Sequence, residues 1–287
     1  MVHPSGPPTT TTTIPSPVEP TGQPVVLVLD YPGHRPEEKL TGLRLEAAGF
    51  DVRYVLTRPL PRDLSADAYA RRALQAAGEL PHGVHAVLAY CMSASLAQHV
   101  AVLTSASHLL LLDAERSTPA VIAKELLSVL RSFTPGAELP AWWSEEAVSH
   151  RPEEVMERVE GHLHSVIAAA LAEDDSGDDL PGAQPDPAVL QVARTMAGTY
   201  LDWLAHLMAA HRGALPAFAG RSAHLVSADH RLPGSWDGIA TLDHHRVACA
   251  RESLAVDEET RRITLELLGA QPHFSSPYGG NSYAESA

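Results

Sequence analysis

Short apolar runs alternate with amphipathic segments along the first half of the chain. Val25–Asp30 (VVLVLD), Val84–Ala89 (VHAVLA) and His108–Leu112 (HLLLL) are typical of buried strands, and Asp51–Val55 alternates as a strand does. Apolar residues at helical spacing fill the segments between them, which predicts helices over residues 37–48, 66–77, 92–103 and 119–130. Strands separated by helices predict βαβ units. We therefore expect an α/β protein with a mostly parallel sheet and helices on both faces.

The alternation of strands and helices is interrupted in the second half. Two long helical patterns cover Pro152–Ala172 and Pro187–His211, strands return at Ala223–Ser227 and Gly238–Leu242, and a last helix is expected over Asp257–Leu268. This order predicts a sheet-bearing core in two parts, residues 24–133 and 221–270, with a helical lid inserted at residues 134–220. Residues 1–23 are rich in proline and threonine and predict a disordered leader, while residues 271–287 predict a flexible tail.

Charge and cysteine content narrow the class of protein. The chain has 287 residues, a formal net charge of -14 and a pI of about 5.5, which argues against nucleic-acid or membrane-surface binding. The sequence has no apolar run of membrane-spanning length. Two cysteines cannot build a disulfide framework, so we expect a cytoplasmic protein.

The strongest chemical signal lies where a predicted strand runs directly into a helix. Residues 84–94 read VHAVLAYCMSA, with Cys91 at the junction between small residues, Ala89 and Ser93. A nucleophile at a tight strand-to-helix turn needs small neighbours, because the turn brings backbone segments very close. The helix amino end favours a thiolate, and the Met92 N–H would face a developing oxyanion. The motif alone leaves open that Cys91 is a small buried apolar residue.

Two further residues complete a possible catalytic set. Asp113 ends the apolar run HLLLL, and His244 lies in GIATLDHH, where the last strand is expected to end. A nucleophile needs a base, and the base needs an orienting acid, so the order Cys91, Asp113, His244 predicts a triad. His245 stays an alternative base, and an aspartate after a strand is often a turn residue. The remaining histidines lack metal-ligand spacing, so we expect neither a metal nor a cofactor.

The chain resembles the type I and type II thioesterases of non-ribosomal peptide and polyketide assembly lines over residues 24–268. The resemblance rests on Trp236 and on four segments, which are AYCMSA (89–94), LLLLDAERS (109–117), AHLVSAD (223–229) and GIATLDHH (238–245). It implies an α/β-hydrolase fold with a substrate-covering lid. It also implies Asp113 as the acid, the Tyr31 N–H in DYPG (30–33) as the second oxyanion donor beside Met92, and a carrier protein with a phosphopantetheine thioester as the partner.

A cysteine nucleophile changes the expected outcome of the reaction. It would keep the acyl group as a thioester, which retains acidic α-protons and a good leaving group. In this the chain resembles the standalone Dieckmann cyclases that release β-ketoacyl-aminoacyl chains as tetramates or pyridones. We therefore predict acyl loading onto Cys91 and release by ring closure under a lid that covers a bulky, apolar chain. A hydrolytic thioesterase, an aminoacyl shuttle and a non-catalytic binding module remain alternatives, and the oligomeric state is open.

Overall fold

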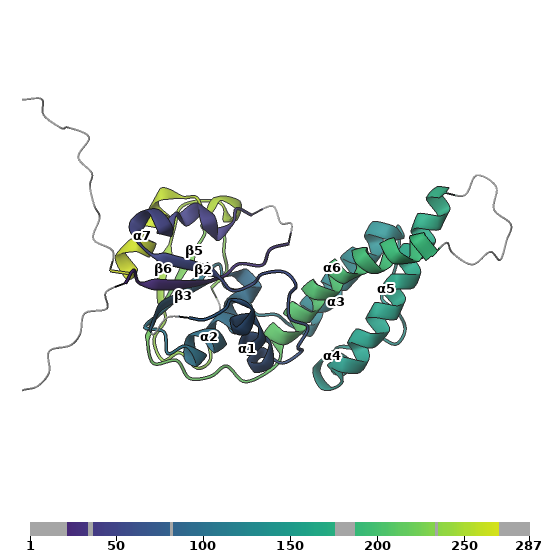
Figure 1. The fold of residues 1–287 in the computed structure, drawn as a ribbon, viewed down its shortest axis with the longest axis horizontal. Coiled ribbons are helices and arrows are strands. Elements are labelled where there is room, and N and C mark those ends of the chain that lie inside the picture. The colour runs from purple at the N-terminus through teal and green to yellow at the C-terminus, as the bar shows by residue number, and fades with distance from the viewer. Residues whose placement is uncertain (1–21, 34–36, 81–82, 176–186, 233–234, 270–287) are drawn as a thin grey trace, which may run out of the picture.

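A single parallel sheet forms the centre of the protein (Figure 1). The computed structural model describes residues 22–33, 37–80, 83–175, 187–232 and 235–269, so nearly all of the predicted leader and the whole predicted tail lie outside the described residues. Within these ranges, six strands occur in the order β2-β1-β3-β4-β5-β6, and each pairs in parallel with its neighbours. The strands are β1 (Val25–Leu29), β2 (Asp51–Tyr54), β3 (Val84–Tyr90), β4 (His108–Leu112), β5 (Arg221–Val226) and β6 (Asp243–Arg246).

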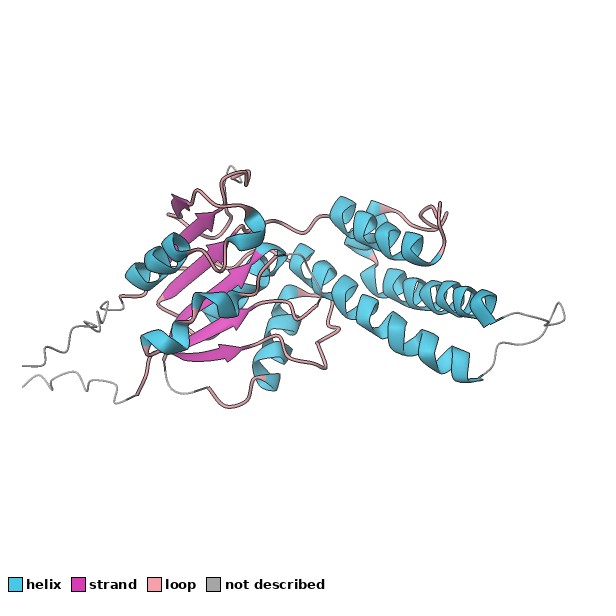
Figure 2. Ribbon diagram, turned by 90° about the horizontal axis from the view of Figure 1, so that it is seen from above, coloured by secondary structure: helices cyan, strands magenta, loops and turns pink. Residues whose placement is uncertain are grey.

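Helices cover both faces of the sheet. One face packs against α1 (Ala66–Ala76) and α2 (Ala94–Leu103), and the other against α7 (Glu258–Leu267) and short helical turns near residues 40–48 (Figures 1 and 2). The strand residues are buried on both sides because both faces are covered; β3, for example, is buried at six of its seven positions. The predicted α/β architecture, a parallel sheet with helices on both faces and an inserted helical region, is confirmed. Since all strands are parallel, their carboxyl ends lie at the same end of the sheet.

The helical region projects from the carboxyl end of the sheet (Figure 1). It contains α3 (Pro119–Phe133), α4 (Glu145–His150), α5 (Pro152–Asp175) and α6 (Pro187–His211), which share one apolar core. We expected α3 to belong to the sheet-bearing part, but its buried residues Ile122, Leu126 and Leu130 pack among the other three helices. The helical region therefore begins at Pro119, before the predicted boundary at residue 134. In the described residues, no helix is long and apolar enough to cross a membrane.

Two expected elements differ in the structure. The helix expected over residues 37–48 is a pair of 3-10 turns, because Arg44 adopts a left-handed conformation (φ 51°) that interrupts helical hydrogen bonding. The strand expected at residues 238–242 lies instead at Asp243–Arg246. Apolar side chains in GIATL suggested a strand, whereas the actual strand is a largely exposed sheet edge that needs no apolar face.

Candidate active site

Cys91 occupies a sharp turn between β3 and α2. The strand ends at Tyr90, Cys91 has φ 52°, and a 3-10 turn over Cys91–Ser93 leads into the helix. A positive φ is unfavourable for a residue with a Cβ, at a cost on the order of 1–3 kcal/mol, and such strain is concentrated at functional sites. Ala89 and Ser93 are almost completely buried, so the turn has room for small side chains only. This is the geometry expected of a nucleophile elbow.

The side chain next to the Cys91 thiol is an arginine. Arg251 Nη2 donates a hydrogen bond to Cys91 Sγ at 3.0 Å. The same guanidinium binds two carboxylates, Glu115 through Nη1 and Glu37 through Nε, the latter at 3.3 Å. Its Cζ also lies 5.9 Å from the centre of the Tyr90 ring. We refer to Cys91, Arg251, Glu115 and Glu37 as the Cys91 cluster.

The Cys91 cluster opens into a cavity of about 1040 Å³ between the sheet edge and the helical region. Tyr31 and Met92, the residues predicted to supply oxyanion donors, line the same cavity. Lys39 Nζ donates to the Tyr31 carbonyl oxygen at 2.7 Å, which fixes the backbone at this point. The remaining lining residues come from the loop after β1, from the end of β3 and the elbow, and from α3 and α6: Gly33, Tyr90, Ser93, Val121, Lys124, Glu125, Ser128, Val129, Ser132, Met196, Thr199, Tyr200 and Trp203.

The protonation of Cys91 follows from its surroundings. Burial raises the pKa of the Cys91 thiol to about 12, and the Glu115 carboxylate also raises it, while Arg251 and the Met92 N–H lower it. Because Glu115 and Glu37 both bind Arg251, they offset its positive charge at the sulfur. The thiol form therefore predominates near neutral pH in this arrangement, and Arg251 is the group that would stabilise the thiolate.

Asp113 lies at the end of β4, as expected, but its partners belong to β5 and the loop after it. Its Oδ1 accepts from the Ser227 N–H at 2.8 Å and its Oδ2 from the Ser227 hydroxyl at 2.7 Å. His230 Nδ1 is 3.6 Å from Oδ1, and the ring of His230 lies against that of His224. Asp113 is fully buried. We refer to Asp113, Ser227, His224 and His230 as the Asp113 cluster, which the structure keeps apart from the cavity lining.

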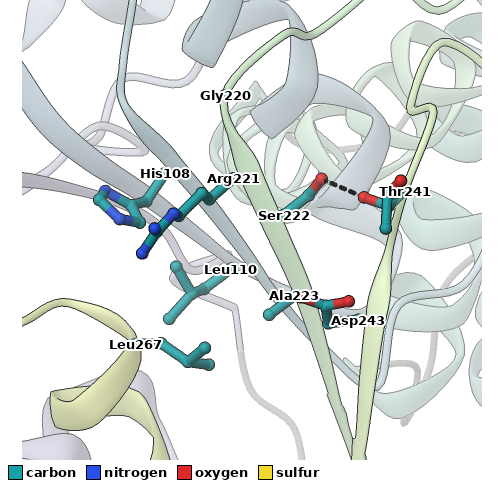
Figure 3. Close-up of a pocket in the computed structure, with 9 residues that line it drawn as sticks. All are labelled: His108, Leu110, Gly220, Arg221, Ser222, Ala223, Thr241, Asp243 and Leu267. Carbon is teal, nitrogen blue, oxygen red and sulfur yellow. Dashed lines mark hydrogen bonds between the residues drawn. The ribbon is translucent and has the colours of Figure 1, made fainter.

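The structure corrects the expected position of His244. The residue is the second of β6 rather than the one that ends a strand, and its exposed side chain lies against the His224 ring at 5.5 Å. Asp243, the residue before it, lines a small cavity of about 430 Å³ together with His108 and Arg221, the first residues of β4 and β5 (Figure 3). In the sheet register, His244 is level with His224, Leu111 and Ala89, two residues before Cys91, but it lies on the strand three places from β3.

The sheet order explains why a residue within β6 cannot approach Cys91. Strand β6 is three places from β3, which corresponds to roughly 14 Å at the usual spacing between strands. A loop after β6 can return over the sheet edge, and Arg251 is on this loop. The alternative base, His245, also lies within β6, at the same number of strands from β3.

His206 is the histidine that contacts the elbow. Its Nε2 is 3.2 Å from the Ser93 hydroxyl and its Nδ1 is 3.1 Å from the Tyr69 hydroxyl. The residue is fully buried, and burial lowers its pKa to about 3. His206 therefore stays neutral and connects α6 to the elbow through Ser93, while the thiol of Cys91 is bound by Arg251.

Three residues of the Cys91 cluster were not predicted from the sequence: Arg251, Glu115 and Glu37. Glu115 is two residues after Asp113, in a segment already associated with the site, so its carboxylate was an available alternative. Arg251 lies between the last strand and the last helix. No pattern within that interval indicates a contact with Cys91.

Comparisons with known proteins found only distant similarity to solved structures. No model of a protein family matches the chain, and no curated protein does. Among solved structures, the chain is similar to an alpha/beta hydrolase family protein from Desulfitobacterium hafniense (16% identity, 87% of this chain and 97% of that one, TM-score 0.48). It is also similar to RedJ, the thioesterase from the prodiginine pathway of Streptomyces coelicolor (16% identity, 91% and 96%, TM-score 0.43). A third similar structure is an epoxide hydrolase from metagenomes of hot environments (15% identity, 88% and 93%, TM-score 0.46). At these levels, the similarity does not assign an activity.

Proposed function

We propose that the protein is an acyl-transfer enzyme that takes an acyl chain from a carrier-protein thioester onto Cys91. The observation that carries the proposal is the position of the Cys91 sulfur. It lies on a strained elbow, faces a cavity of about 1040 Å³ and is bound by the Arg251 guanidinium at 3.0 Å. A fixed cation beside a sulfur stabilises the thiolate, which is the nucleophilic form of cysteine.

Acyl loading by this arrangement requires no histidine. The Cys91 thiolate attacks the thioester carbonyl, and the pantetheine thiolate leaves, so one thiolate replaces another without a net change in protonation. The Met92 N–H follows the nucleophile directly and the Tyr31 N–H lies on the same cavity wall, so both can donate to the oxyanion. Arg251 would hold the thiolate before attack and again after product release.

Release of the acyl chain is the second step. No histidine is among the described residues that line the cavity, and its carboxylates are Glu37, Glu115 and Glu125. We propose that an activated methylene of the bound chain attacks the Cys91 thioester in a Dieckmann condensation and expels the Cys91 thiolate. The pantetheine thiolate from the loading step takes up the proton lost by the methylene. The products are then a cyclic tetramate or pyridone and a free carrier thiol.

A second candidate function is a non-catalytic module that binds an acyl ligand. One observation favours it: the pKa of Cys91 is raised to about 12 by burial and by Glu115, so the thiolate is scarce near neutral pH. Covalent loading of Cys91 distinguishes the two functions.

The test uses a β-ketoacyl-aminoacyl thioester of N-acetylcysteamine and intact-mass measurement of the protein. Wild-type protein should gain the mass of the acyl chain and release a cyclic product, whereas Cys91→Ala should do neither. Cys249→Ala is the matched control, because Cys249 lies outside the cavity lining, and it should behave as wild type. A linear acid as product would indicate hydrolysis. Binding without acylation would favour the module.

A further inference from the structure

A carboxylate on α3 faces the cavity with few partners. Glu125 lines the cavity, and its Oε2 accepts a hydrogen bond from the Trp203 indole N–H at 3.0 Å. Among the residues that the structure describes, this indole is the one hydrogen-bond donor to Glu125, and no ion pair holds the carboxylate. Glu125 is partly buried, so water compensates its charge incompletely. An unpaired, partly buried carboxylate favours a cationic ligand.

The two positively charged side chains of the lining do not balance the charge of Glu125. Arg251 already binds Glu115 and Glu37 at the Cys91 end of the cavity. Lys124 is the residue next to Glu125 on the same helix, and neighbouring residues on a helix do not face each other. The charge of Glu125 is therefore left for a ligand to balance.

Aromatic side chains from α6 and from the loop after β1 also line the cavity. The Trp203 ring, which holds Glu125, lies 4.6 Å from the Tyr31 ring, and Tyr200 lines the cavity one helical turn before Trp203. Aromatic faces attract ammonium groups, and the attraction increases when the cation is partly desolvated. The wall beyond the elbow is therefore not the uniformly apolar surface that we expected for a bulky hydrocarbon chain. It combines a carboxylate with aromatic rings, a pairing suited to an alkylammonium group.

We propose that Glu125, Trp203 and Tyr200 form a subsite for a protonated amine carried by the acyl chain. The inference rests on the proposed function for the reaction itself, since Cys91 would receive the chain whose amine Glu125 binds. It adds a substrate class: the preferred acyl chains bear a positive charge, and fatty acyl chains of the same length are poorer substrates.

The kinetic test compares two thioesters of equal length. The ε-aminocaproyl and heptanoyl thioesters of N-acetylcysteamine differ by an ammonium group in place of a terminal methyl. Wild-type protein should acylate Cys91 about tenfold faster with the amine, as expected for a charged hydrogen bond to a carboxylate. Glu125→Gln should reduce the ratio to near one by slowing the amine alone. Glu160→Gln, an exposed carboxylate on α5, is the matched control and should keep the wild-type ratio. Equal wild-type rates, or an unchanged ratio in Glu125→Gln, would overturn the proposal.

A binding measurement separates this proposal from the proposed reaction. Cys91→Ala protein is titrated calorimetrically with the unreactive amide analogues of the two thioesters. Tighter binding of the amine that is lost in Cys91→Ala/Glu125→Gln supports the subsite even if no acyl transfer is detected. Equal binding of both analogues overturns the subsite, even if Cys91 is acylated normally by the thioesters.

Discussion

The Asp113 cluster and the Cys91 cluster lie at the carboxyl end of the same sheet. The Asp113 cluster lies outside the cavity lining, whereas the Cys91 cluster lines the cavity. Asp113 is fully buried, and both of its oxygens accept hydrogen bonds from Ser227. Arg251, in contrast, is partly exposed and reaches from the loop after β6 to the Cys91 sulfur at the cavity wall. Buried polar groups with complete hydrogen bonding stabilise a fold, whereas partly exposed charged groups at a cavity are available to a ligand.

The same short segment supplies an acid to each cluster. Asp113 and Glu115 are two residues apart, and Asp113 has φ 41°, which turns the chain sharply after β4. The turn directs Asp113 toward Ser227 beyond β5 and leaves Glu115 at the cavity with Arg251. Position at a strand end is therefore not sufficient to assign a catalytic acid, because the direction of the chain after the strand decides which carboxylate faces the nucleophile.

The largest effect is expected from Asp113→Ala. The change leaves the Ser227 N–H and hydroxyl without their acceptor in a buried site, which should lower the free energy of unfolding by roughly 3 kcal/mol. Chemical denaturation monitored by circular dichroism measures this loss. An Asp113→Ala variant as stable as wild type would contradict a structural role for Asp113.

Asp113→Asn tests the same contrast at the level of activity. The amide keeps an acceptor oxygen for Ser227, so folding should be affected less than in Asp113→Ala. If Asp113 is structural, Cys91 acylation should fall by less than about threefold in this variant, whereas an acid that orients the base is expected to cost far more. A loss above a hundredfold would return Asp113 to the catalytic set.

The sequence was informative where local pattern determines structure. The elbow at Cys91 was predictable because a buried strand, a nucleophile with small neighbours and a helix occur consecutively within residues 84–103. The position of His244 was not predictable in the same way, because β6 is a short, exposed edge strand with little apolar signal. The strand starts five residues later than expected, so His244 lies within β6 and not after the end of a strand. The pairing of Arg251 with Cys91 joins residues 160 positions apart, and no local pattern encodes such a contact.

Substitution of Arg251 or Glu115 is expected to have an intermediate effect on the reactivity of the Cys91 thiol. Arg251→Met removes the cation that lowers the pKa of Cys91, so the thiolate fraction and the rate of iodoacetamide alkylation at pH 8 should fall about tenfold. Glu115→Gln removes a charge that raises this pKa, so the alkylation rate should rise. We therefore expect the alkylation rate to fall in Arg251→Met and to rise in Glu115→Gln. A decrease in both would indicate that the ion pair only holds the loop after β6 in place.

The pH dependence of the same reaction gives a finer test. With the pKa of Cys91 raised to about 12, the thiolate fraction of wild-type protein increases across the whole neutral and mildly alkaline range. The alkylation rate should therefore rise about tenfold per pH unit from about pH 7 to pH 10, without a plateau. A plateau below pH 9 would mean that Arg251 outweighs burial at the sulfur. Cys249→Ala protein is used so that the rate reports Cys91 alone.

The smallest effect is expected from His244→Asn. The His244 side chain is exposed on β6 and lies against His224, and the strand is three places from β3. Substitution of an exposed edge-strand residue usually changes the free energy of unfolding by less than about 0.5 kcal/mol. Acylation of Cys91 should also stay within about twofold of wild type, because the side chain reaches neither the sulfur nor the cavity. The measurement is the rate of acyl loading by intact mass, with His245→Asn in parallel. A loss above a hundredfold in His244→Asn but not in His245→Asn would indicate that the loop after β6 rearranges when substrate binds. His244 would then replace Arg251 beside the Cys91 thiol.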